Sequence, residues 1–368
     1  MKTNIKFHPD NTKVAVIGGG NIGTQFACVC ASKGYKVNLL TSKPELFDGN
    51  IEVIDESGNV VIGTLNTITN DFHEATENCQ IIIVTYPAFK LIETAKKLLP
   101  LVKEGLCICV IPGTGGAEFA FKDCIKAGAT LYGLQRVPSV ARLEQYGKRV
   151  RCEGLRTELS VSSIPNRMRQ DISEFMEYIW EIPCRILPNY LCITLTPSNP
   201  ILHTTRLRSL FANYDANIIY NKNPLFYGEW DDDSSRLLIA CDQELQNMIK
   251  ILNKLDLSAV KSLRDHYESS TIEAMTDKLC SIKSLHNLYT PMIKVEGGWI
   301  PDFNSRYFTA DFPYGLAILE EFAKVLSIPV PNITDTMNWY RQITGESEHL
   351  KLCQYGISTI DDIYSMYS

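Results

Sequence analysis

The chain has 368 residues, of which 45% are hydrophobic and 21% are charged, and it carries a net charge of −6 at pH 7. This length is typical of two domains, and the composition excludes a disordered chain. The acidic balance argues against a nucleic-acid partner, and no apolar run approaches the roughly 18 residues of a membrane helix, so no membrane partner is expected.

The N-terminus and the cysteines bear on the compartment. The opening stretch, MKTNIKFHPDNTK, contains no apolar signal core. The 12 cysteines, without an export signal, predict reduced thiols and a cytoplasmic location. The Cys-x-Cys pairs, Cys28/Cys30 and Cys107/Cys109, are interpreted as small apolar core residues, and no metal site is expected.

Short apolar runs alternate with helical patterns through the first half of the chain. Strands are expected at residues 13–18, 36–40, 81–84, 106–111 and 184–187, a hairpin or further strands at 51–68, and helices at 21–33, 88–99, 117–126 and 166–182. Continuous Val/Ile runs indicate strands covered on both faces, and the alternation favours a doubly wound parallel α/β sheet.

The pattern changes after residue 195. Amphipathic helices are expected at residues 235–255, 271–289, 313–326 and 335–343, and the acidic run 229–233 is interpreted as a loop that caps the first of them. We therefore divide the chain into an α/β domain, 1–195, and a mainly α-helical domain, 196–368.

A glycine motif follows the first expected strand. It reads Gly18-x-Gly20-Asn21-Ile22-Gly23, and a helix and a second strand follow it within the expected distance. In such a motif the first glycine permits a tight turn, the second lets the main chain approach a pyrophosphate, and the third allows close packing of helix on strand. The motif predicts a Rossmann-type dinucleotide-binding domain.

The end of the second strand bears on the choice of cofactor. An NAD site usually has an acidic residue there, which accepts a hydrogen bond from the ribose 2′-hydroxyl. This chain has Thr41, Ser42 and Lys43 instead. Hydroxyls and a cation suit a 2′-phosphate, so NADP(H) is favoured over NAD(H).

Two segments of the second half contain residues suited to acid–base chemistry. In Ser-Asn-Pro-Ile-Leu-His, residues 198–203, Asn199 is expected to cap a helix that has His203 in its first turn. Arg306 and Asp311 lie just before another helix. A structural histidine, a surface ion pair and a helix cap are the alternative interpretations of these three residues.

The motifs together resemble those of a known family. The chain combines Asn-Pro-x-x-His with Arg-Tyr-x-x-x-Asp-x-Pro-x-Gly-Leu at 306–316, after the glycine motif. In this order and spacing they resemble the opine dehydrogenases of the octopine/nopaline type over nearly the whole chain. The resemblance implies an NAD(P)-dependent enzyme that reductively joins the amino group of an amino acid to an α-keto acid, or catalyses the reverse oxidation.

The resemblance also implies roles for individual residues. His203 matches the catalytic histidine of the family, Asp311 its paired aspartate and Arg306 its carboxylate-binding arginine. Ala310 replaces a glutamate of many relatives, which affects the tuning of the site. Gln135 and Arg136 lie where the family contacts substrate, although a loop ion pair explains them equally well.

The sequence also allows two other functions and bears on the oligomeric state. A ketone-reducing two-domain dehydrogenase of the ketopantoate or glycerol-3-phosphate type would share the first domain, but we find no comparable lysine-centred motif. A catalytically silent dinucleotide-binding sensor is the second alternative. The amphipathic helices of the second half lead us to expect a homodimer.

Overall fold

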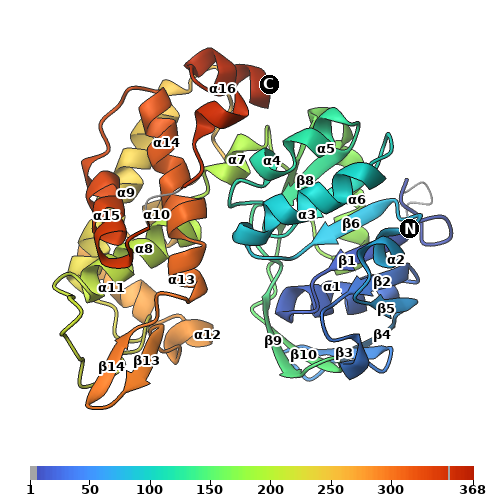
Figure 1. Ribbon diagram of the computed structural model, residues 1–368, viewed down its shortest axis with the longest axis horizontal. Coiled ribbons are helices and arrows are strands. Elements are labelled where there is room, and N and C mark those ends of the chain that lie inside the picture. Colours follow the sequence, from blue (N-terminus) through green and yellow to red (C-terminus); the bar gives the residue numbers. More distant parts are fainter. Residues whose placement is uncertain (1–5, 347–348) are drawn as a thin grey trace. The chain divides into compact units, whose positions relative to one another are not determined.

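The computed structural model describes residues 6–346 and 349–368 (Figure 1). The chain forms two compact units, Met1–Thr194 and Leu195–Ser368. Within the described ranges, no helix is long and apolar enough to cross a membrane.

The first unit is built on an eight-stranded sheet with the order β12-β11-β8-β7-β6-β1-β2-β5. Its strands are β1 (Lys13–Ile17), β2 (Lys36–Leu40), β5 (Thr67–Thr69), β6 (Ile81–Val84), β7 (Cys107–Val110), β8 (Thr130–Leu134), β11 (Leu159–Ile164) and β12 (Cys184–Ile186). Neighbours from β5 to β8 are parallel, and β11 runs antiparallel to β8. The order β5-β2-β1-β6-β7-β8 is that of a dinucleotide-binding fold, so the predicted doubly wound sheet is confirmed.

Apolar strands and flanking helices account for this architecture. Every residue of β6 and β7 is buried, as expected for strands covered on both faces. The helices of the unit are α1 (Asn21–Ser32), α2 (Phe72–Thr76), α3 (Leu91–Leu98), α4 (Ala117–Ala120), α5 (Lys122–Lys126), α6 (Arg169–Trp180) and α7 (Leu191–Thr194) (Figure 1).

A smaller sheet with the order β4-β3-β10-β9 packs on α1. It consists of β3 (Asn50–Ile54), β4 (Val60–Thr64), β9 (Val140–Gln145) and β10 (Arg149–Glu153). The β3–β4 pair confirms the predicted hairpin, whereas the β9–β10 hairpin was not predicted. Gly63 allows the contact with α1, since a Cβ there would lie 2.3 Å from the main-chain oxygen of Cys28.

The second unit is mainly helical, as predicted. It contains α8 (Ser198–Leu210), α9 (Asp232–Ile251), α10 (Leu263–His266), α11 (Ile272–Cys280), α12 (Lys283–His286), α13 (Arg306–Thr309), α14 (Ala317–Val325), α15 (Pro331–Thr344) and α16 (Ile360–Tyr367), with a hairpin of β13 (Met292–Val295) and β14 (Gly298–Pro301) (Figure 1). Asp231 caps α9 as expected from the acidic run, because its side chain accepts from the Ser234 amide. The single helix predicted at 271–289 is wrong, since the extended main chain of Ile282 separates α11 from α12.

Candidate active site

The glycine motif forms the turn between β1 and α1. Gly18 has φ +116°, a conformation that favours glycine. A Cβ on Gly23 would lie 1.7 Å from the Gly18 carbonyl oxygen, whereas a Cβ on Gly20 would meet no atom within 4 Å. Gly18 and Gly23 therefore serve the fold, and Gly20 leaves open space beside the main chain. This open cradle fits the pyrophosphate of a dinucleotide.

The first turn of α1 offers main-chain donors to such a group. The first intrahelical bond runs from the Thr24 amide to the Gly20 oxygen, so the amides of residues 21–23 precede the helical ladder. The Asn21 side chain has another task, because its Oδ1 accepts from the Leu143 amide of β9 at 2.9 Å. Ile22 packs against the core of the unit. Asn21 and Ile22 can therefore contribute to phosphate binding through their amides.

The end of β2 contains the three residues predicted to select the cofactor. Thr41 is buried, and its hydroxyl lies 3.1 Å from the Tyr146 hydroxyl and accepts from the Lys43 amide at 3.4 Å. Ser42 and Lys43 are exposed. The ammonium of Lys43 lies 5.7 Å from the centre of the Tyr146 ring. Tyr146, in the β9–β10 turn, was not among the predicted site residues.

A cavity of about 340 Å³ adjoins this strand end. Its lining consists of Leu40, Thr41, Ser42, Asn70, Phe72, Tyr86, Lys90, Glu93, Thr94 and Lys97. Lys97 pairs with Glu93 at 2.7 Å, while the Lys90 ammonium lies over the Tyr86 ring. Lys43 is not in the lining. The cavity therefore offers hydroxyls and the ammonium of Lys90 to an anionic ligand, while its other cation, Lys97, is paired with Glu93.

In the second unit, α8 carries the candidate histidine. The helix begins at Ser198, after Pro197, and no side chain caps it. The prediction that Asn199 caps this helix and that His203 lies in the first turn is therefore wrong. Pro197 has a φ of −79°, near the helical value, so the helix starts earlier and His203 lies in its second turn. His203 is 8% exposed.

Asp311 contacts this histidine directly. Its Oδ2 lies 2.8 Å from Nδ1 of His203. It precedes a π-helical turn, Phe312–Leu316, but its side chain makes no capping bond, so the helix-cap interpretation is wrong. Gly315 packs this turn against α8, since a Cβ there would meet the Pro200 ring at 3.1 Å. The Pro-x-Gly part of the motif thus brings the carboxylate to the ring.

Aromatic side chains enclose the remainder of the His203 ring. Its Nε2 lies 3.0 Å from the Tyr227 hydroxyl, and the Tyr307 ring centre is 4.3 Å away. Phe226 meets the ring edge-on at 5.6 Å. Sequence reasoning missed Tyr227, whose only signal is the aromatic composition of the segment that precedes α9.

Arg306 lies at the start of α13, exposed. Its guanidinium makes no side-chain hydrogen bond or ion pair with any described residue, which contradicts the surface ion-pair interpretation. A free guanidinium is suited to bind a carboxylate through paired hydrogen bonds. Gln135 belongs to the first unit, where its Nε2 donates to the Cys192 carbonyl at 3.2 Å, and Arg136 is also engaged in an interaction.

Both halves of the chain match known protein families. Residues 186–344 match the family described as NAD/NADP octopine/nopaline dehydrogenase, alpha-helical domain. Residues 13–116 match the N-terminus of NAD-dependent glycerol-3-phosphate dehydrogenase. The match of the helical half favours an opine dehydrogenase over the ketopantoate and glycerol-3-phosphate types of two-domain dehydrogenase.

Whole proteins are also similar along almost their entire length. The chain is 25% identical to the octopine dehydrogenase of Mizuhopecten yessoensis, with 95% of this chain and 98% of that protein covered. It is 25% identical to the opine dehydrogenase of Haliotis discus hannai, with 96% and 98% covered. A solved structure of octopine dehydrogenase with NADH and L-arginine shares the fold, with a TM-score of 0.84, 24% identity, and 96% of this chain and 97% of that chain covered.

Proposed function

Because this chain belongs to the opine dehydrogenase family of NAD(P)-dependent oxidoreductases that act on CH–NH bonds, we propose that it condenses an α-keto acid reductively with the amino group of an amino acid. The product is an N-(carboxyalkyl)amino acid, and the reverse reaction oxidises it. The reductant in this proposal is NADPH, which supplies a hydride when it is bound.

The contact between His203 and Asp311 carries the proposal. A carboxylate at 2.8 Å from Nδ1 fixes the orientation of the ring. The histidine can then supply the proton that the carbonyl or carbinolamine oxygen takes up as water leaves. The free guanidinium of Arg306 holds a substrate carboxylate and so fixes the carbon that is reduced.

The cofactor preference rests on the end of β2 and the adjoining cavity. Thr41 and Ser42 provide hydroxyls where an NAD site usually has a carboxylate, and Lys90 lines the same cavity. A 2′-phosphate would meet donors and a cation there. We expect kcat/KM to be higher with NADPH than with NADH, and a clear preference for NADH would contradict this part of the proposal.

We also propose a cytoplasmic homodimer. All of the chain's cysteines are free thiols, which suits a reducing compartment. Cell fractionation tests the location. Light scattering at micromolar concentration tests the assembly, and a monomer there would contradict the homodimer.

One assay separates the proposal from its alternatives. NADPH oxidation is followed with a panel of α-keto acids, with and without amino acids, and the products are identified by mass spectrometry. We expect oxidation that requires both substrates and yields a secondary amine. Oxidation with a keto acid alone, giving a hydroxy acid, would indicate a ketone reductase. Cofactor binding without turnover across the panel would indicate a sensor.

A further inference from the structure

Both ring nitrogens of His203 are engaged. Nδ1 faces Asp311 at 2.8 Å, and Nε2 faces the Tyr227 hydroxyl at 3.0 Å. With the carboxylate at Nδ1, the proton that the imidazole exchanges during catalysis is the one at Nε2. The atom next to that position is the phenol oxygen of Tyr227.

Tyr227 is held in a turn that Arg206 organises. Arg206 follows His203 by one helical turn of α8 and is 1% exposed. Its Nε donates to the Phe226 carbonyl at 3.2 Å, and its Nη2 donates to the Glu229 carbonyl. These carbonyls flank Tyr227 along the chain. One guanidinium thus fixes the main chain on both sides of the tyrosine.

Further contacts hold the guanidinium itself. Its Nη1 donates to Asp231 at 2.6 Å and to the Ser234 hydroxyl at 2.9 Å. The Trp230 ring lies against it, with its centre 5.3 Å from Cζ. Burial lowers the pKa of Arg206, and the charge of Asp231 opposes that effect. Each of the three guanidinium nitrogens of Arg206 therefore has a hydrogen-bond partner.

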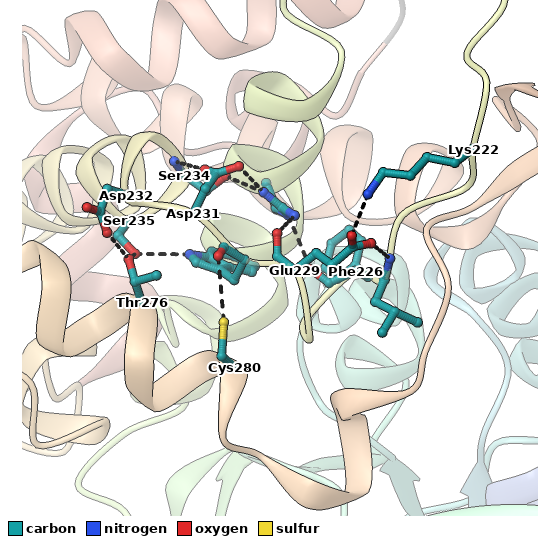
Figure 2. Close-up of polar contacts among 12 residues, drawn as sticks. Lys222, Phe226, Glu229, Asp231, Asp232, Ser234, Ser235, Thr276 and Cys280 are labelled. Atoms are coloured by element: carbon teal, nitrogen blue, oxygen red, sulfur yellow. Dashed lines mark hydrogen bonds and ion pairs between the residues drawn. The ribbon is translucent and has the colours of Figure 1, made fainter.

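Further side-chain contacts hold the turn that contains Tyr227 (Figure 2). Glu229 accepts from Lys222 at 2.6 Å and from the Leu225 amide at 2.7 Å. The Trp230 indole donates to Ser235 at 3.0 Å, and Cys280 of α11 contacts the Trp230 carbonyl. A buried cation is weak evidence for stability, because well-packed apolar residues often serve as well. The network is better explained by the orientation that it imposes on the turn.

We propose that Tyr227 is the third member of a proton-transfer chain, Asp311–His203–Tyr227, and that Arg206 is the residue that positions it. This inference rests on the proposed function. The Tyr227 hydroxyl gives its proton to the substrate oxygen or nitrogen while it takes the Nε2 proton of the imidazolium. His203 becomes neutral, Tyr227 is again a phenol, Asp311 stays ionised, and the substrate gains one proton.

The environment of Tyr227 suits such an exchange. Burial raises the pKa of this phenol well above its ordinary value. A free phenolate is therefore disfavoured, and the hydroxyl must receive one proton as it releases another. Its ring stacks on Trp230 at 6.2 Å, which leaves rotation of the hydroxyl hydrogen as the movement required.

The first test is Tyr227→Phe, which keeps the ring and its packing but removes the hydroxyl. We expect kcat to fall roughly 10- to 100-fold, with the KM of the keto acid and the Kd of NADPH within about twofold of wild type. Tyr289→Phe is the matched control, because Tyr289 is 67% exposed in the same unit. Wild-type kcat in Tyr227→Phe would overturn the proposal.

The second test asks whether Arg206 acts through Tyr227. Arg206→Lys keeps the charge but loses the planar fork, and it should lower kcat roughly 10-fold or more. In a Tyr227→Phe background, Arg206→Lys should lower kcat at most about twofold further. Equal losses in both backgrounds would overturn the positioning role. Ser234→Ala, which removes one contact of the guanidinium, repeats the comparison with less risk to folding.

A third measurement does not depend on activity. Nitrogen-15 NMR of the histidine rings reports the hydrogen bond at Nε2 of His203, identified by comparison with His203→Ala. Tyr227→Phe should shift that resonance, and Tyr289→Phe should not. An unchanged resonance would overturn the Tyr227 contact. If the resonance shifts but the protein does not condense a keto acid with an amine, the contact between Tyr227 and His203 stands. The proposed function, and the proton transfer that rests on it, would then be refuted.

Discussion

The two units assemble their functional groups in different ways. In the first, a contiguous stretch, residues 18–23, provides a turn, an open space and main-chain donors. In the second, His203 meets a tyrosine 24 positions away and an aspartate 108 positions away. Main-chain sites depend on local conformation, whereas side-chain sites depend on tertiary packing. Substitutions in the glycine motif should therefore affect cofactor binding and folding, whereas substitutions of His203 and the side chains that contact it should affect chemistry.

The largest expected effect is that of His203→Ala. We expect kcat to fall by ~10²–10⁴, the range for loss of a positioned acid–base group, with the Kd of NADPH almost unchanged. Steady-state kinetics and a binding titration check both quantities. His286→Ala is the control, since that histidine is exposed in the same unit and bonds the Cys280 carbonyl. Near-wild-type turnover would leave His203 as a structural residue.

Asp311→Asn should follow, with kcat lower by roughly 10²-fold, because the His203 ring loses the carboxylate that orients it. Since Asp311 and His203 act as one unit, the double variant should lose little more than His203→Ala alone. Additive losses would show that the two residues act independently, despite their 2.8 Å contact.

Arg306→Ala should act mainly on substrate binding. The loss of a charge-assisted contact of about 1.5–3 kcal/mol predicts an increase in the KM of the keto acid or amino acid of roughly 10- to 100-fold. Arg236→Ala serves as the control, because this arginine is exposed on α9. A normal KM for both substrates would assign carboxylate binding to another residue.

Gly20→Ala and Gly23→Ala should separate binding from folding in the first unit. A Cβ on Gly20 has room within the protein but occupies the cradle, so the Kd of NADPH should rise about tenfold or more with an unchanged Tm. A Cβ on Gly23 would lie 1.7 Å from the Gly18 oxygen, so this variant should lower the unfolding free energy by at least ~1–3 kcal/mol. Equal Tm values for the two variants would contradict this division.

The smallest effect concerns a buried carboxyl of the helical unit. Burial raises the pKa of Asp242 from 3.8 to about 6, although its Oδ2 accepts from the Leu263 amide at 2.8 Å. Its contribution to stability is present below pH 3.8 and is lost as the pH rises through about 6.

Asp242→Asn should therefore raise the unfolding free energy at pH 7 by about 1–3 kcal/mol and reduce its decline with rising pH. Urea unfolding at several pH values measures both effects, with the exposed Asp277→Asn as the control. An unchanged dependence on pH would show that Asp242 titrates in the folded protein as in the unfolded chain.

Local patterns determined the first unit well. The runs at β1, β2, β6 and β7 and the glycine motif predicted the strands, their parallel pairing and the dinucleotide-binding fold. The β9–β10 hairpin was missed because charged residues such as Arg142 and Glu144 occupy alternate positions and obscure its apolar face. Tyr146, at its turn, reaches Thr41 through that hairpin.

In the second unit, the sequence by itself indicated helices and, through their motifs, His203, Arg306 and Asp311. The sequence did not decide whether Asp311 caps a helix or pairs with His203, because a carboxylate just before a helix has the same local sequence pattern in both roles. Tertiary packing decided between the two roles, since Gly315 brings the π-helical turn close to α8 and so brings the carboxylate to the histidine. Tyr227 depended entirely on the tertiary structure, because a buried arginine and two main-chain carbonyls place it and no local pattern records such contacts.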